Sequence, residues 1–246
     1  MNLFTYFLGS LFVIRSIFRF SYVTTNYLFE KNILDLPKYK FEKIHECIYS
    51  SIHGILVSVM ASFSIKNSLF DYYKIYNESS IKTYEKDNEL QYLTASFCLS
   101  YFIIDLLKCI YEKKYLFILH HLAAINLLGL TFYSFYNNEN KGFYAMYLIF
   151  LLESNTFLLN IGFLLKEFKF HYSITCLSWI IHLYFFVLFR LITIPRIIFI
   201  YYYNESLTIK SLAELPSFIL ILAGSVYWSY RQTIGINKYL KENCVI

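Results

Sequence analysis

Residues 100–124 read SYFIIDLLKCIYEKKYLFILHHLAA, and this stretch already indicates a membrane protein. One apolar run ends here, a polar turn at 112–114 follows, and a second apolar run begins. Because about twenty apolar residues cross the hydrocarbon core of a bilayer as a helix, the stretch predicts two membrane helices joined by a short turn. It also places Asp105, His120 and His121 inside those helices, where ionisable side chains are costly.

The remainder of the chain has the same character. Of its 246 residues 57% are hydrophobic, 21% are aromatic and only 16% are charged, which lies outside the range of soluble domains. Length and hydropathy together give seven candidate spans, at approximately 2–20, 43–66, 89–110, 115–136, 142–165, 173–200 and 211–233. The predicted fold class is therefore all-α, a polytopic membrane protein with about seven transmembrane helices.

Charge and cysteine content argue against several other classes of protein. The net charge of +5, from 22 basic and 17 acidic residues, is modest, and the basic residues form short clusters between apolar runs. Nothing in this pattern indicates nucleic-acid binding. The five cysteines are odd in number and lack a C-x-x-C pair, which argues against a disulfide framework and against a zinc site. Because we find no internal repeat and no long linker, we expect one compact domain.

The distribution of basic residues predicts an orientation in the membrane. The larger group lies in loops that we therefore assign to the cytosol: Lys31, Lys38, Lys40, Lys43, Lys108, Lys113, Lys114, Lys166, Lys169, Arg231, Lys238 and Lys241. The smaller group lies in the opposite loops: Lys66, Lys74, Lys82, Lys86, Lys141 and Lys210. We expect a lumenal N-terminus and a cytosolic C-terminus. The N-glycosylation sequons at Asn77 and Asn204 fall in loops that this orientation makes lumenal.

Polar residues within the spans share helical faces. A carboxylate at mid-membrane costs roughly 2.5–3.5 kcal/mol on insertion scales, so such groups usually face the interior of a bundle. Glu153, Thr156 and Asn160 are spaced i, i+3 and i+7, which places them on one face of the fifth span. The other interior polar residues in the predicted cytosolic half are His53, Asp105, His120, His121 and His182. The pattern predicts an enclosed polar pocket that opens toward the cytosol.

Each of these residues also has a structural explanation. An interior histidine such as His182 could simply be hydrogen-bonded within the core. Asp105 could pair with a histidine of a neighbouring helix or with Arg190. The adjacent histidines are harder to explain in this way. The side chains of His120 and His121 point about 100° apart on a helix, so each can reach a different partner.

Three runs of residues carry a resemblance to a known family. They are Ser100-Tyr101-Phe102…Asp105-Leu106-Leu107, then Phe117-Ile118-Leu119-His120-His121-Leu122-Ala123-Ala124, and then Leu152-Glu153-Ser154-Asn155-Thr156-Phe157…Asn160. Two outlying matches are Ser50-Ser51-Ile52-His53 and Phe185-Phe186…Phe189-Arg190…Pro195. In this order and spacing the runs resemble the TLC-domain family, which includes ceramide synthases and other TLC-domain-containing proteins.

The resemblance implies a TLC-type helical bundle at residues 42–235. Residues 1–41 would then form an N-terminal transmembrane anchor and a cytosolic linker, and residues 236–246 a cytosolic tail. By resemblance His120 and His121 inherit the lining of the family's acyl-transfer pocket. Ceramide synthases have an Asp-x-x-Asp pair on the next helix, where this chain has Glu153 and Thr156. The departure favours a branch of the family that is not a ceramide synthase.

Two hypotheses for the function follow. The first is a membrane protein of the endoplasmic reticulum or another endomembrane that binds or senses an acyl lipid and contributes to lipid homeostasis, without a bound cofactor or metal. Its pocket would be lined by His53, Thr156, Asn160, His182 and Arg190. The second is an N-acyltransferase of the ceramide synthase type that uses acyl-CoA as co-substrate. Its catalytic residues would be His120, His121, Asp105 and Glu153.

Other functions fit less well. A di-iron desaturase needs several closely spaced histidine boxes, whereas only one pair among the six histidines is close. A receptor or a transporter stays open, although the chain lacks the repeated halves and broken helices typical of transporters. Nucleic acid is not expected as a partner, and a homodimer stays open.

Overall fold

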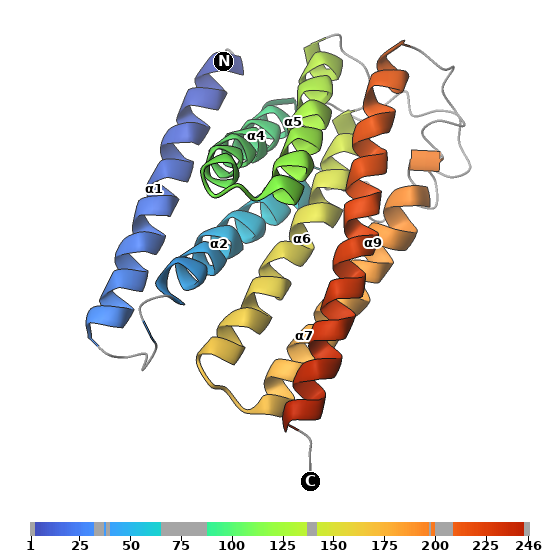
Figure 1. The fold of residues 1–246 in the computed structure, drawn as a ribbon. Coiled ribbons are helices and arrows are strands. Elements are labelled where there is room, and N and C mark those ends of the chain that lie inside the picture. Colours follow the sequence, from blue (N-terminus) through green and yellow to red (C-terminus); the bar gives the residue numbers. More distant parts are fainter. Residues whose placement is uncertain are drawn as a thin grey trace.

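The computed structural model describes residues 3–31, 37, 40–64, 88–136, 142–196, 198–199 and 209–243. Within these ranges the chain forms seven α-helices and one π-helical segment (Figure 1). They are α1 (Leu3–Glu30), α2 (Phe41–Ser64), α4 (Asn88–Tyr111), α5 (Tyr115–Tyr136), α6 (Gly142–Glu167), α7 (Tyr172–Phe186), the π-helical η3 (Val187–Thr193) and α9 (Ile209–Asn243). The predicted all-α fold class is confirmed.

Six stretches of the described helices are long and apolar enough to cross a membrane. They are Phe4–Glu30, Phe41–Ser64, Glu89–Tyr111, Tyr115–Tyr133, Met146–Glu167 and Tyr172–Arg196. The seventh predicted span, at 211–233, lies in α9 and is not among these six. The helix α9 is longer than expected and has Pro216 inside it. The helix α1 also runs ten residues beyond the predicted end of the first span at residue 20. The length of an apolar run reflects the thickness of the hydrocarbon core. A helix can continue past that run until a helix-breaking residue or a turn ends it.

Six of the helices close into a ring. The helix α2 packs against α4 and α6, α4 packs against α5, α5 against α9, α9 against α7, and α7 against α6. The helix α1 lies outside the ring and contacts α4 and α2 (Figure 1). The start of α1 and the end of α9 lie at opposite ends of the bundle (Figure 1). The sequence indicated polar faces on several separate helices. In this ring those helices surround one common interior.

An apolar core fills one end of the bundle. Its fully buried members Val57, Ala61, Ala95 and Met146 come from the second half of α2 and the first halves of α4 and α6, and Ile14 of α1 packs onto them. The opposite end of the ring holds the basic residues that begin α2 and end α4 and α6. Apolar packing therefore dominates the first end, and basic side chains gather at the second.

The helices α2 and α6 approach each other closely at Gly54. A Cβ atom on this residue would lie 3.2 Å from the carbonyl oxygen of Glu153 and 3.4 Å from the amide nitrogen of Phe157. Backbones can come this near only where a residue lacks a side chain, as membrane helix pairs often require. The neighbour of Gly54 in sequence, His53, is thereby held against Glu153 of α6.

The hairpins α4–α5 and α6–α7 end their first helix in the same way. Lys113 and Lys169 have φ of 56° and 55°, in the left-handed region. The amide of Lys114 donates to the carbonyl of Cys109 at 2.9 Å, and the amide of Phe170 donates to that of Leu165 at 3.0 Å. These are the bonds of a Schellman motif, in which the left-handed position is usually glycine. Here both positions hold lysine, which places positive charge at the end of the bundle where the basic loops gather.

Candidate functional site

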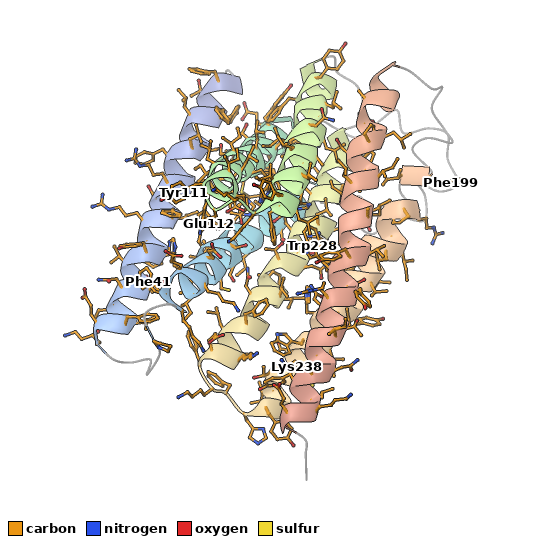
Figure 2. The ribbon with its side chains drawn as sticks, viewed as in Figure 1. Phe41, Tyr111, Glu112, Phe199, Trp228 and Lys238 are labelled. Carbon is orange, nitrogen blue, oxygen red and sulfur yellow. The ribbon has the colours of Figure 1, made fainter. Side chains whose placement is uncertain are left out.

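A cavity of about 660 Å³ lies inside the ring, and every ring helix contributes to its wall. Representative wall residues are Tyr49 of α2, Asp105 of α4, His120 of α5, Glu153 of α6, His182 of α7, Arg190 of η3 and Trp228 of α9. Trp228 lies on the side of α9 toward α5 and α6 (Figure 2), and its ring packs 5.6 Å from that of Phe117. The volume falls in the range of about 300–1,000 Å³ that is usual for small-molecule sites.

Eight of the predicted site residues line this cavity: Asp105, His120, His121, Glu153, Thr156, Asn160, His182 and Arg190. His53 does not line it. Its imidazole is fully buried behind the wall, stacked on the ring of Tyr101 at 3.6 Å, and its Nδ1 lies 3.5 Å from Oε2 of Glu153. His53 is therefore placed to hold Glu153 from behind, and the chemical roles of all nine residues stay predictions.

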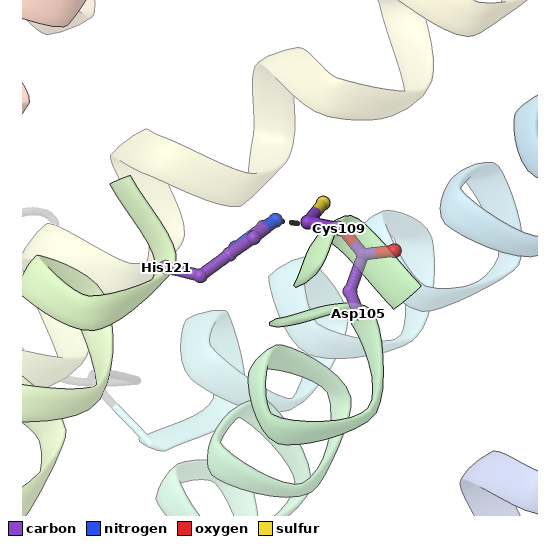
Figure 3. Close-up of side chains that lie close together, drawn as sticks. All are labelled: Asp105, Cys109 and His121. Carbon is purple, nitrogen blue, oxygen red and sulfur yellow. Dashed lines mark ion pairs between the residues drawn. The ribbon is translucent and has the colours of Figure 1, made fainter. Parts of the chain in front are cut away.

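The imidazole of His121 on α5 meets the carboxyl group of Asp105 on α4. The Nε2 atom of His121 lies 2.7 Å from Oδ2 of Asp105. Only 4% of His121 is exposed, whereas Asp105 is half-buried and faces the cavity. The thiol of Cys109 lies next to the pair (Figure 3). A carboxylate in this position fixes the orientation of the imidazole, as in many sites that move protons.

His120 points to a different neighbour. Its ring meets the indole of Trp228 edge-on, at 5.0 Å and 90° between planes. The two adjacent histidines of α5 therefore contact different helices, as their 100° separation predicted. Among the described residues the Nδ1 atom of His120 has no hydrogen-bond partner, although it is buried.

Arg190 brings a buried positive charge to the cavity wall. It is 7% exposed, and its Nη2 donates a hydrogen bond to the carbonyl of Leu152 at 2.8 Å. The guanidinium lies 5.0 Å from the centre of the Phe186 ring, in cation–π range. Arg190 sits in η3, where the wider π-helical turn is supported by a bond from the hydroxyl of Thr193 to the carbonyl of Leu188. Single π-helical turns inside α-helices are frequent at functional sites.

Several buried polar atoms of the wall are not satisfied by the described part of the chain. Three examples are Nδ1 of His120, Nδ2 of Asn160 and Nε of Arg190. A buried donor or acceptor left without a partner costs about 1–3 kcal/mol. All three residues line the cavity, so a polar ligand or water inside it can supply the missing partners.

Four charged residues form an ion network in the cavity wall where α4 ends and α5 begins. Lys108 pairs with Glu46, and Lys114 pairs with Glu112 at 2.6 Å and with Glu46 at 3.4 Å. Glu112 lies at the end of α4 (Figure 2). Partial burial acts to lower the pKa of Lys114, but the hydrogen bond to Glu112 and the charge of Glu46 together raise this pKa above its ordinary value. Lys114 therefore stays positive throughout the neutral range.

The wall carries more positive than negative side chains. Its cations are Lys43, Lys108, Lys114, Lys166, Arg190 and Arg231, and its anions are Glu46, Asp105, Glu112 and Glu153. With neutral histidines the excess is two positive charges. A wall of low dielectric strengthens the field of such an excess, and the cavity therefore favours a ligand with negative charge.

Sequence reasoning missed two contributions to this site. The first is α9, whose Trp228, Arg231 and Gln232 line the cavity at a spacing of i, i+3 and i+4, which a search for polar helical faces could have found. The second is Cys109, which follows Asp105 by one helical turn and shares its face. The sequons at Asn77 and Asn204 lie outside the described residues.

Comparison with known proteins gives one match. Residues 43–233 match the family model TRAM_LAG1_CLN8, described as TLC domain. The match covers more than half of the chain and includes the whole wall of the cavity except residues 235 and 236. No curated protein and no solved structure matches the chain.

Proposed function

The chain belongs to the TLC-domain family, and on this premise we propose that it binds an acyl lipid in the cavity of its helical ring and contributes to lipid homeostasis of an endomembrane. The observation that carries the proposal is the cavity itself. It combines buried polar atoms that lack partners with a positive charge excess inside a membrane bundle. A lipid head group with a negative charge would provide hydrogen-bond partners for these atoms and would balance the positive charge.

Arg190 is the residue best placed to receive the head group. Its guanidinium is a planar donor that binds carboxylate and phosphate oxygens in pairs, and its Nε lacks a partner in the described chain. His120 and Asn160 offer further polar atoms on neighbouring helices. We therefore expect the bound lipid to be anionic, such as a fatty acid or a fatty acyl-CoA.

Aromatic side chains supply the apolar part of the wall. Phe102, Phe117, Trp179, Phe186 and Trp228 line the cavity from α4, α5, α7 and α9. Rings of this kind bury large apolar area and suit a methylene chain. The pairing of aromatic wall and polar floor supports an acyl lipid over a small hydrophilic solute.

Three finer features are part of the proposal. Glu153 followed by Thr156, in place of an Asp-x-x-Asp pair, supports a branch other than the ceramide synthases. The cavity wall includes Lys43, Lys114 and Lys166, which are basic residues of the group assigned to the cytosol. The cavity would accordingly open to the cytosol, with the N-terminus in the lumen, in the endoplasmic reticulum or a related membrane.

A second candidate is acyl transfer from acyl-CoA to the amine of a long-chain base. It is favoured by the 2.7 Å contact that Asp105 makes with His121, which resembles the base and orienting acid of nucleophile-activating sites. His121 would accept a proton from the amine as its nitrogen attacks the thioester carbonyl. The carbon–sulfur bond then breaks, the coenzyme A thiolate leaves with a proton, and an amide remains.

Lipid binding is tested with the purified protein in nanodiscs and radiolabelled palmitate or palmitoyl-CoA. We expect saturable binding by the parent protein, weakened roughly ten-fold or more in Arg190→Gln because a charge-assisted contact is lost. Arg196→Gln, the same change at an exposed position off the cavity wall, is the matched control and should bind like the parent. If the parent binds no acyl lipid saturably, or if Arg190→Gln binds equally well, the proposal is wrong.

The two candidates are separated by incubating the same protein with a long-chain base and palmitoyl-CoA. Acyl transfer predicts an amide product by mass spectrometry, which is lost in His121→Ala and in His120→Ala if either imidazole is the base. Lipid binding without turnover predicts no amide while the protein retains its ligand. Amide formation at the parental rate by both variants would refute the assignment of the base.

A further inference from the structure

We propose that Asp105, Cys109 and His121 form a binding site for a single Zn²⁺ ion. A carboxylate oxygen of Asp105, the Sγ of Cys109 and a ring nitrogen of His121 all lie within 4.8 Å of one another (Figure 3). A tetrahedral ion needs bonds of about 2.0–2.3 Å to such atoms, which small side-chain rotations from these positions provide. The site does not depend on the proposed lipid.

The backbone arrangement makes the three ligands converge. Asp105 and Cys109 are separated by four residues on α4, so their side chains lie above one another on one helical face. That face is opposed by His121 of α5, about two helical turns after the tight hairpin that ends at Lys114. Because the hairpin fixes both helices, the ligand set is held by two rigid elements rather than by loops.

The chemistry of the donors selects the metal. Thiolate and imidazole ligands suit Zn²⁺, whereas Mg²⁺ and Ca²⁺ prefer sets made of oxygen alone. An ionised Asp105 and a thiolate at Cys109 together carry two negative charges, and His121 binds as a neutral imidazole. The complex with Zn²⁺ is then neutral overall, which avoids the cost of a net charge at a membrane-buried position.

The fourth position of the ion would face the cavity. All three ligands line the cavity wall, and Asp105 is only partly buried. Three protein ligands with one open position are the arrangement of zinc sites that bind water or substrate, in contrast to closed structural sites with four. An oxygen of a bound head group can therefore complete the coordination shell.

The site lacks the C-x-x-C signature of many zinc sites because that signature is typical of ligands in turns and loops. A C-x-x-C pair brings two thiolates together in a turn, whereas on a helix residues four apart, such as Asp105 and Cys109, lie on one face. The absence of C-x-x-C argued against zinc in the sequence, yet it does not exclude an Asp-x-x-x-Cys face opposed by a histidine. This inference replaces that earlier expectation for Asp105, Cys109 and His121.

The test is the metal content and cobalt spectrum of the full chain, purified in detergent without chelators. We expect about one equivalent of zinc per chain by mass spectrometry. After removal of zinc, added Co²⁺ should give the d–d bands of a tetrahedral ion and a thiolate-to-cobalt charge-transfer band in the near ultraviolet. Cys109→Ser should lose the charge-transfer band, and Asp105→Asn should reduce zinc retention at least ten-fold.

Cys98→Ser is the matched control because Cys98 is equally buried on the same helix but lies outside the cavity wall. It should keep both the zinc and the cobalt band. Gel filtration establishes that each variant is folded. If a variant is not folded, the metal content and cobalt spectrum of the parent protein decide the test. Absence of stoichiometric metal and of a charge-transfer band in the parent would overturn the proposal, as would a band that survives in Cys109→Ser.

Discussion

Each acidic residue deep in the cavity wall is matched by a histidine from another helix. Glu153 of α6 lies beside His53 of α2, and Asp105 of α4 lies beside His121 of α5. Removing one member of a buried pair leaves the other without compensation, which is strongly destabilising. The ionisable residues that looked anomalous in the sequence are therefore coupled to the packing of the ring as well as to its cavity.

At the residue scale the hairpin lysines give a prediction about stability. Lys113 has a φ of 56°, which costs an L-residue about 1 kcal/mol relative to glycine. Lys113→Gly should therefore raise the midpoint of thermal unfolding in detergent. The same change at Lys238, an exposed position within α9, should lower it because glycine disfavours a helix interior. If Lys113→Gly were less stable than the parent, the side chain of Lys113 would make a contact that stabilises the protein by more than the positive φ costs.

Individual residues were the part of the site that the sequence predicted best. Charged groups within apolar runs are rare, so Asp105, Glu153 and Arg190 could be singled out without any structure. The exact neighbour of each could not be predicted. Helical phase says which side of a helix a residue occupies, but it does not say whether the residue lines a hollow or, like His53, lies one layer behind it.

At the element scale the contact between α2 and α6 depends on Gly54. In Gly54→Ala the new methyl group would press on the backbone of Glu153, at 3.2 Å from its carbonyl oxygen. Gly129→Ala is the matched control, since a Cβ atom there has nothing within 4 Å. Both changes gain the same helix propensity, about 1 kcal/mol.

The two alanine variants should consequently differ in stability by about 1–3 kcal/mol, with Gly54→Ala the weaker. The measurement is thermal unfolding followed by tryptophan fluorescence in the same detergent. Equal stability of Gly54→Ala and Gly129→Ala would mean that α2 and α6 can move apart freely, contrary to the close approach described above.

Two elements were beyond the reach of sequence periodicity. The π-helical turn η3 differs from an α-helix by the pairing of backbone groups, which no hydrophobic period reveals over seven residues. The helix α9 was expected as a span of ordinary length, but it contains 35 residues and supplies part of the cavity wall. Its wall residues Trp228, Arg231 and Gln232 lie within the predicted span, but a hydropathy window does not show which face of a helix lines a cavity.

At the scale of the whole molecule the closure of the ring is the decisive feature. Seven helices of this composition could also have packed as a flat layer or as two bundles. Hydropathy and charge predicted the number of spans approximately and an orientation, but the order of neighbours around the ring arises from side-chain packing between distant segments. Only that order brings α9 next to α5 and closes the wall.

The orientation gives a prediction for the intact protein in microsomes. If the basic loops are cytosolic, a C-terminal epitope tag should be digested by added protease, and a glycan at Asn77 should be protected and removable by an endoglycosidase. The Asn77→Gln variant lacks this sequon, so loss of the glycan in it identifies Asn77 as the modified residue. Protection of the tag would show that the orientation is the reverse, with the basic loops and the lysines of the cavity wall on the lumenal side.

The account stands on the cavity being the place where an acyl lipid binds, and photocrosslinking tests this most directly. The protein in nanodiscs is labelled with a fatty acid that carries a diazirine, and the modified residues are located by mass spectrometry. We predict saturable labelling of the cavity wall, at residues such as Phe186 and Trp228, which excess unlabelled palmitate suppresses. Labelling that does not saturate and falls only on exposed outer positions, such as Ile180 and Val226, would contradict the account.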